Sequence, residues 1–195
     1  MSLLSQLMNA FQILPGVGPK SAQRICFNLL QKNKDNAIKL ADILKEACEK
    51  IGECQRCRTL TENDLCRICL SDKRNPNQLC IIETPADLMQ IEQATDYSGT
   101  YFVLHGRLSP LDGMGPGELG FPQLVEILAN EPIKEVIIAT NSTLEGQTTA
   151  QYIAQMCQKV DIKATGLARG VPLGGELEYV DANTIAHAFG SREQY

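Results

Sequence analysis

The chain has 195 residues, of which 44% are hydrophobic and 21% are charged. This length allows one large domain or two to three small modules, and the composition excludes an intrinsically disordered chain. The net charge of -5 is unevenly divided: residues 1–80 carry 12 Lys+Arg and 8 Asp+Glu, a net of +4, whereas residues 81–195 carry 6 and 15, a net of -9. The basic half points mildly to a nucleic-acid partner, although many small domains differ in charge by this much.

The N-terminal segment, MSLLSQLMNAF, has no basic region and no sustained apolar core, so it does not resemble a signal peptide. No apolar run approaches the roughly 18 residues that a membrane span needs. We therefore expect a soluble cytoplasmic protein without a membrane partner. In that compartment the eight cysteines are not expected to form structural disulfides.

The first fifty residues predict three helices. Apolar residues recur at helical spacing over 3–14, and Pro15 ends that helix. The sequence PGVGPK (15–20) predicts a tight hairpin, and Pro19 suits the first turn of a second helix. A third amphipathic helix with one buried apolar stripe is expected over 35–52. Residues 1–53 are thus predicted to form a small all-helical module.

The hairpin between the first two helices is a candidate DNA contact. Gly16 and Gly18 let the backbone approach a partner closely, and the N–H groups at the start of the next helix can bind a phosphate. Lys20 and Arg24 are four residues apart, so they share one helix face and could neutralise neighbouring phosphates. Such contacts are independent of base sequence and sensitive to salt. The alternative is a tight helix connection with two solvated cations.

Residues 54–78 have almost no periodicity, and they contain two C-x-x-C pairs separated by eight residues. The four cysteines are Cys54, Cys57, Cys66 and Cys69. Two such pairs can place four thiolates in a tetrahedron, and soft sulfur ligands favour Zn²⁺. Because four protein ligands leave no open position, we predict one structural zinc ion per chain; a redox dithiol pair is the alternative. Arg56, Arg58 and Arg67 would offset the negative charge, and the other four cysteines are expected to be buried.

From residue 79 onward, strands alternate with helices. Apolar runs predict strands at 79–83, 100–104, 135–139 and 161–168, with helices at 84–94, 121–129 and 146–158. This alternation predicts a parallel α/β sheet. The Gly-rich stretch 106–120 lacks a P-loop pattern and is expected to be a mobile loop over the sheet or an oligomer contact. Residues 174–189 predict a short extended piece and a terminal helix from about Asp181.

These motifs, in this order, resemble the RecR family of bacterial recombination mediators over essentially the full length. ILPGVGPKSAQR resembles the helix-hairpin-helix of that family, and the cysteine cluster resembles its zinc finger. CIIETPADL and IIATNSTLEGQTTAQYIA resemble its Toprim domain, and TGLARGVPLGGELEYVDANTIAHA its C-terminal segment. The resemblance implies a multidomain α+β fold: a helix-hairpin-helix at 1–53, a four-cysteine zinc finger at 54–78, an α/β Toprim domain with a parallel sheet at 79–172, and a C-terminal helical segment at 173–195.

The resemblance implies a non-enzymatic role in DNA repair and recombination. With RecO, and in many bacteria RecF, members of the family help load RecA onto single-stranded DNA at gaps. The resemblance also implies binding to single- and double-stranded DNA without base specificity, at the nucleoid. Lys20 and Arg24 match the hairpin positions that contact DNA. A homo-oligomer, either a dimer or a tetrameric ring, would surround the DNA.

The loop ATNSTLEG (139–146) follows the third predicted strand, where α/β sheets place their chemistry. In catalytic Toprim enzymes, a strand-end Glu and a downstream Asp-x-Asp pair hold Mg²⁺. Glu83 matches that Glu, but Asn141 and Thr143 occupy the aspartate positions, and Glu145 follows. Because Mg²⁺ prefers carboxylate oxygens, the resemblance implies a degenerate site. Glu83 and Glu145 could still hold one ion weakly, or accept hydrogen bonds from a docked partner.

Two other functions stay open on the sequence. One is a metal-dependent Toprim nuclease or primase-like enzyme, and the other is a zinc-stabilised adaptor that does not contact DNA. His105 and His187 are expected to be structural, because no Cys or Ser nucleophile shares a motif with either.

Overall fold

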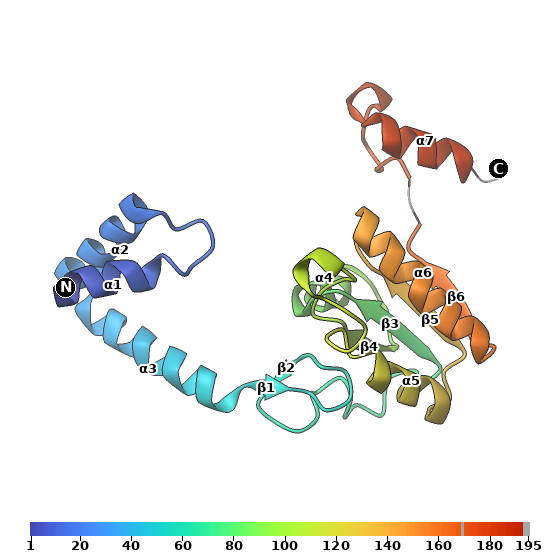
Figure 1. Ribbon diagram of the computed structural model, residues 1–195, viewed down its shortest axis with the longest axis horizontal. Coiled ribbons are helices and arrows are strands. Elements are labelled where there is room, and N and C mark those ends of the chain that lie inside the picture. The colour runs from blue at the N-terminus through green and yellow to red at the C-terminus, as the bar shows by residue number, and fades with distance from the viewer. Residues whose placement is uncertain (169, 193–195) are drawn as a thin grey trace. The chain divides into compact units, whose positions relative to one another are not determined.

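The computed structural model describes residues 1–168 and 170–192. Arg169 and the end of the expected C-terminal segment, residues 193–195, lie outside the described residues. The chain divides into two compact units, residues 1–51 and 52–195, which are described one at a time. Figure 1 labels their helices and strands.

The first unit consists of three helices joined by short turns. They are α1 (Leu3–Phe11), α2 (Pro19–Lys32) and α3 (Lys34–Lys50). The hydroxyl of Ser2 caps α1 by accepting a hydrogen bond from the Ser5 N–H. α1 ends at Phe11, earlier than the apolar spacing predicted, because the chain then turns toward the hairpin. Gly16 in that hairpin has φ 76°, a left-handed conformation that favours glycine.

The interior of the first unit is very small. Ala22 and Cys26 of α2 are its two buried side chains, and neither α1 nor α3 buries a residue. The expectation that α3 buries its apolar stripe is therefore wrong for this chain by itself: Leu40 is 53% exposed and Leu44 is 61% exposed. Cys48 lies on the same helix and is also exposed, contrary to expectation.

The second unit begins with a short antiparallel pair and continues with a four-stranded sheet. The pair is β1 (Gly52–Glu53) and β2 (Leu60–Thr61), and the sheet strands are β3 (Gln78–Ile82), β4 (Thr100–Val103), β5 (Glu135–Ala139) and β6 (Lys163–Gly166). All neighbouring sheet strands are parallel, in the order β4-β3-β5-β6. The connecting helices are α4 (Pro85–Ala94), α5 (Phe121–Asn130) and α6 (Leu144–Lys159) (Figure 1). The predicted parallel α/β sheet is confirmed.

Alternating strand residues build two cores, one on each face of the sheet. On one face, Leu79, Phe102 and Val136 pack with α5 and α6. On the other face, Cys80 and Tyr101 pack with α4 and with the cysteine cluster. This alternation follows from the strand geometry, which points successive side chains to opposite faces.

The order of the strands reverses between β3 and β5. The chain passes from β3 to β4 on one side and then crosses back to β5 on the other side. Open α/β sheets bind their ligands at such a reversal, outside the carboxyl ends of the strands. Ile82 is paired with Ala139 across β3 and β5, so the residues that follow these two strands meet at that point.

The C-terminal segment contains a 3-10 turn, η2 (Leu177–Tyr179), and the helix α7 (Ala182–Gly190). The turn lies where an extended piece was expected. The Asp181 carboxylate caps α7 by accepting hydrogen bonds from the N–H groups of Asn183 and Thr184, which confirms the predicted helix start. Across residues 1–168 and 170–192, no helix has both the length and the apolar character that crossing a membrane requires.

Candidate functional sites

The two cysteine pairs come together into one cluster. All four sulfur atoms lie within 4.8 Å of one another. In a zinc–sulfur tetrahedron with bonds of about 2.3 Å, the sulfur–sulfur edges are about 3.8 Å, so the cluster is near the size that zinc requires. Cys54, Cys57 and Cys66 are buried, and Cys69 is half-buried. The donor set and its spacing therefore fit a tetrahedral zinc ion held by all four cysteines.

Backbone hydrogen bonds shape the two cysteine turns. The Arg58 N–H donates to the Cys54 carbonyl at 2.9 Å, and the Leu70 N–H donates to the Cys66 carbonyl at 3.1 Å. The Cys66 N–H donates to the Cys54 sulfur at 3.3 Å, which links the two turns. Arg58 has φ 63°, so the first turn places a non-glycine residue in the left-handed region.

The thiols differ in acidity when no metal is bound. The pKa of Cys57 is raised, first by its hydrogen bond with Cys69 and then by burial, and burial also raises the pKa of Cys66. The pKa of Cys69 is lowered to about 5, first by the hydrogen bond from Cys57 and further by Arg56, although burial opposes the shift. Because zinc binds thiolates, binding at neutral pH must release the protons of Cys57 and Cys66.

The cysteine cluster is part of the hydrophobic core on one face of the sheet. Its buried cysteines share one core with Ile82, Tyr101 and Val103. The Val103 N–H of β4 donates to the Cys57 carbonyl at 2.9 Å. Zinc held by these cysteines would therefore tie the two cysteine turns to one face of the sheet.

Glu83 and Asn141 form a closed pair at the strand reversal. Glu83 follows β3 and is only 4% exposed. The Asn141 backbone N–H donates to one carboxylate oxygen of Glu83 at 2.8 Å, and the Asn141 side-chain amide donates to the other at 2.7 Å. In a metal site an aspartate here would repel Glu83 unless a cation lay between them. The neutral amide of Asn141 instead donates a hydrogen bond to the carboxylate, so the pair holds together without a metal.

Gly146 makes this closed pair possible, although no sequence motif had singled it out. A Cβ atom on Gly146 would lie 2.1 Å from the Asn141 carbonyl oxygen and 3.0 Å from a Glu83 oxygen. Thr143 caps α6 by accepting a hydrogen bond from the Gly146 N–H at 3.1 Å. In the sequence, the sign of this role was a glycine in the first turn of a helix that directly follows a strand.

Glu145 lies in a different environment from Glu83. Its side chain is 46% exposed, and its carboxylate lies 4.0 Å from the Arg107 Nε atom. Arg107 comes from the Gly-rich stretch, and its neighbour Leu108 donates its N–H to the Thr149 hydroxyl of α6 at 2.9 Å. Glu145 is thus the accessible acid of this loop, while Glu83 is internal.

Arg58 of the zinc finger forms a hydrogen bond with the Gly-rich stretch 106–120. The Arg58 guanidinium donates to the Glu118 carbonyl at 3.0 Å. Gly120 has φ 72°, a conformation that favours glycine, and a Cβ atom there would lie 2.2 Å from a nitrogen of that guanidinium and displace it. His105 Nε2 lies 2.6 Å from the Arg58 carbonyl oxygen, a contact consistent with the expected structural role of this histidine.

The hairpin of the first unit exposes its cations. Gly18 is the N-cap of α2, Pro19 occupies the first turn, and no side chain caps the helix. Lys20 and Arg24 lie one helical turn apart and are exposed. Within the described residues, neither forms a salt bridge. The structure thus leaves two cations and a helix start open to solvent.

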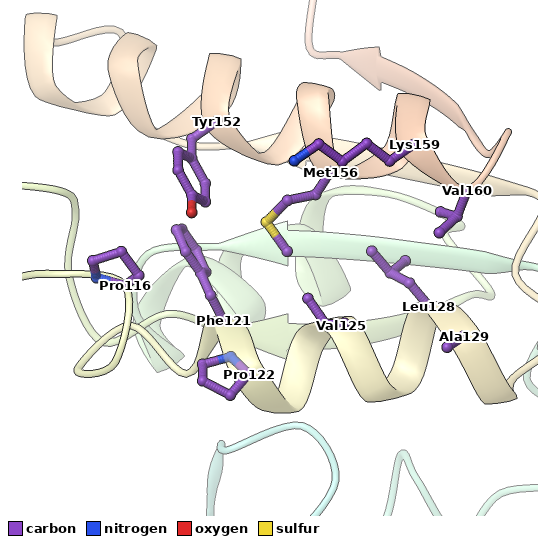
Figure 2. A pocket seen from close by; sticks show the side chains of 10 residues that line it. All are labelled: Pro116, Phe121, Pro122, Val125, Leu128, Ala129, Tyr152, Met156, Lys159 and Val160. Atoms are coloured by element: carbon purple, nitrogen blue, oxygen red, sulfur yellow. The ribbon is translucent and has the colours of Figure 1, made fainter.

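A hollow of about 380 Å³ lies between α5 and α6 (Figure 2). Phe121 and Tyr152 stack at one end, with ring centroids 5.0 Å apart, and Lys159 lies toward the other end. The remaining lining is mainly apolar. The lining has no carboxylate, histidine or thiol, and its titratable side chains are Tyr152 and Lys159.

Models of protein families match the chain in four consecutive segments. The RecR helix-hairpin-helix model matches residues 4–48, the RecR four-cysteine zinc finger domain model 51–71, the Toprim domain model 77–168, and the RecR C-terminal model 170–193. Among curated proteins, a Recombination protein RecR of Xanthomonas oryzae is 53% identical over 193 residues, covering 99% of this chain and 98% of the relative. The chain belongs to the RecR family.

Other members of the family are about as similar. The Recombination protein RecR of Xanthomonas campestris is 52% identical over 99% of this chain and 98% of its own length. That of Xylella fastidiosa is 52% identical over 98% of this chain and 97% of its own length. Membership places the chain among recombination proteins that carry a helix-hairpin-helix, a zinc finger and a Toprim domain. The predicted structural zinc ion is confirmed by the zinc finger match and the geometry of the cluster.

Proposed function

We propose that this protein is a non-catalytic mediator of DNA repair and recombination. It binds single- and double-stranded DNA without base specificity and, with RecO and where present RecF, helps load RecA onto single-stranded DNA at gaps. The observation that carries the DNA-binding part is the exposure of Lys20 and Arg24 beside an uncapped helix start. Such binding would place the protein at the nucleoid of the bacterial cytoplasm.

The closed Glu83–Asn141 pair supports a role without catalysis. Both carboxylate oxygens of Glu83 already accept hydrogen bonds from Asn141. Thr143, at the second aspartate position, is engaged in capping α6. Two-metal phosphoryl chemistry needs several carboxylate ligands, and this loop does not offer them.

The exposed apolar surface of the first unit supports a homo-oligomer. A cavity of about 290 Å³ lies among its three helices, and its lining is apolar throughout. Leu7, Phe11, Leu30, Leu40 and Leu44 contribute to that lining. Such a surface on a small unit favours association with the same surface of a second copy. Pairing of this kind would give a dimer, or one of the two contacts of a tetrameric ring around DNA.

The Toprim loop is proposed as a docking site for RecO. Residues 81–195 carry a net charge of -9, which suits a basic partner better than DNA. Glu145 is the accessible acid, whereas Glu83, Asn141 and Thr143 hold the loop in shape. Glu145→Lys should weaken RecO binding in a pull-down, and Glu126→Lys, at an exposed position of α5, should not.

The DNA-binding proposal is tested with the double variant Lys20→Ala/Arg24→Ala. Its affinity for labelled single-stranded and duplex DNA should fall, and the slope of log affinity against log salt should decrease by about 2, one for each lost phosphate contact. The matched control is Lys34→Ala/Lys39→Ala, which removes two exposed charges from α3. Equal affinity of the two variants would contradict the hairpin assignment. Absence of DNA binding in the unmodified protein would favour the adaptor.

The non-catalytic proposal is tested with purified protein, labelled gapped DNA, and Mg²⁺ or Mn²⁺. We expect neither cleavage nor synthesis. Turnover that disappears in Glu83→Gln, while the melting temperature is retained, would establish the nuclease or primase-like alternative.

A further inference from the structure

One arginine near the cysteine cluster differs from the other two. Arg56 Nη1 donates to the Cys69 sulfur at 3.8 Å. The Arg58 guanidinium is directed to the carbonyls of Leu104 and Glu118. Arg67 is exposed, so solvent screens the charge that was expected to offset the thiolates. Among the described residues, Arg56 is thus the one cation in hydrogen-bond contact with a proposed zinc ligand.

Hydrogen bonds to Glu131 and Thr100 hold the Arg56 guanidinium in place. Its Nε atom donates to one carboxylate oxygen of Glu131 at 2.9 Å, and Nη2 donates to the other. Nη2 also donates to the Thr100 hydroxyl at 3.2 Å. The side chain is only 18% exposed. A planar guanidinium held by a two-pronged carboxylate cannot turn freely, so the remaining nitrogen stays aimed at the sulfur.

A four-thiolate zinc site has a physical need for such a donor. Four thiolates around Zn²⁺ leave two net negative charges in a partly buried place, where water cannot fully solvate them. A hydrogen bond from a cation draws electron density from one sulfur and lowers that cost. Partners of this kind outside the ligand shell typically change metal affinity by about 10- to 100-fold.

We propose that Arg56 is a positioning residue for the zinc ion, which stabilises the metal-bound Cys69 thiolate and slows zinc loss, and that Glu131 anchors it. Glu131 is the C-cap residue of α5, whose backbone N–H donates to the Ile127 carbonyl. The chain of contacts therefore runs from the zinc ligand through Arg56 to the end of a Toprim helix. Retention of zinc in the finger is coupled through this chain to the integrity of α5.

The test is the rate of zinc release from the full-length protein into excess chromogenic chelator. Metal analysis first establishes that each variant contains one zinc ion per chain. A change in release rate can then be assigned to the loss of Arg56 and not to incomplete zinc loading. Arg56→Gln should release zinc about 10- to 100-fold faster than the unmodified protein. Arg56→Lys, which keeps the charge but loses the planar fork, should fall between, and Glu131→Gln should shift the rate in the same direction. The matched control Arg67→Gln should leave the rate unchanged.

A second measurement separates the hydrogen bond from general loosening of the fold. In the cobalt-substituted protein, loss of the Arg56 contact should move the sulfur-to-cobalt charge-transfer band to longer wavelength, because the sulfur lone pairs rise in energy. Arg67→Gln should not move it. Equal release rates for Arg56→Gln and Arg67→Gln would overturn the proposal, and so would faster release with an unmoved band. If Arg56→Gln does not fold, Glu131→Gln and Arg56→Lys carry the same comparison.

Discussion

The two units of the chain differ in how much of their apolar surface they bury. The sheet of the second unit buries large side chains completely, among them Tyr101, Phe102 and Ile81. The first unit buries only Ala22 and Cys26, while Leu30, Leu40 and Leu44 stay exposed. Both units have amphipathic elements, so the difference lies in what covers them. Helices of the same chain cover one face of the sheet in the second unit, whereas the first unit leaves much of its apolar stripe exposed.

The two units also draw their stability from different sources. In the second unit, the cysteine cluster contributes directly to a core that includes β3 and β4. The first unit buries only two small side chains, so we expect association with a second copy to add to its stability. Metal removal and oligomer disruption should therefore act on different halves of the molecule.

Cys57→Ser is expected to have the largest effect. It removes a zinc ligand that is 1% exposed and that lies in the core beside Tyr101 and Val103. Because structural zinc contributes about 10 kcal/mol or more of apparent binding free energy, cooperative unfolding of the second unit should be lost or shifted by tens of degrees. Metal analysis and hydrogen exchange of the strand amides provide the measurement. Cys48→Ser, at an exposed thiol, is the control, and equal melting of the two variants would refute the structural role of the metal.

Asn141→Asp should have a smaller effect, confined to the second unit. The change replaces an amide donor by a carboxylate beside the buried Glu83 and should cost about 2–3 kcal/mol of unfolding free energy. Millimolar Mg²⁺ should recover part of that loss, because a cation can lie between two carboxylates. The control is Thr143→Asp at the N-cap of α6, where Asp also caps well, so the change should stay within about 0.5 kcal/mol. An unchanged melting temperature for Asn141→Asp would show that the closed pair contributes little.

Leu40→Glu/Leu44→Glu should have the smallest effect on the folded chain and a clear effect on assembly. Both leucines line the apolar cavity of the first unit and are already exposed, so the stability of a single chain should change by under about 0.5 kcal/mol. The mass measured by light scattering should fall. Ile38→Glu/Ile43→Glu alters two exposed side chains of the same helix outside that cavity, and it should leave the mass unchanged. The same fall in mass for both variants would mean that this cavity is not the contact.

Local patterns in the sequence predicted what depends on neighbouring residues along the chain. The spacing of the cysteine pairs predicted one metal cluster, and alternating apolar runs predicted the strands of a parallel sheet. The apolar stripe of α3 was also read correctly as a pattern, but a pattern does not say what covers it. Leu40 and Leu44 are therefore exposed where a buried face was expected.

The contacts that decide the two sites depend on residues distant in the sequence. Asn141 meets Glu83 because β3 and β5 are adjacent, and strand order is not written in any one segment. Arg56 and Arg67 occupy similar places next to cysteines, yet only Arg56 meets a carboxylate across the sheet domain, that of Glu131. The need for glycine at position 146 becomes clear only from the structure, which places the Asn141 carbonyl where a Cβ atom would lie.

The hydrogen bond from Val103 to the Cys57 carbonyl has a consequence for solubility. β4 is the outermost strand on its side of the sheet, and outermost strands offer free backbone groups to which another chain can add. The first cysteine turn accepts a hydrogen bond from one of those groups, the Val103 N–H. The folded zinc finger thus hinders another chain from pairing with β4. Protein that has lost its zinc should therefore aggregate by strand addition at β4.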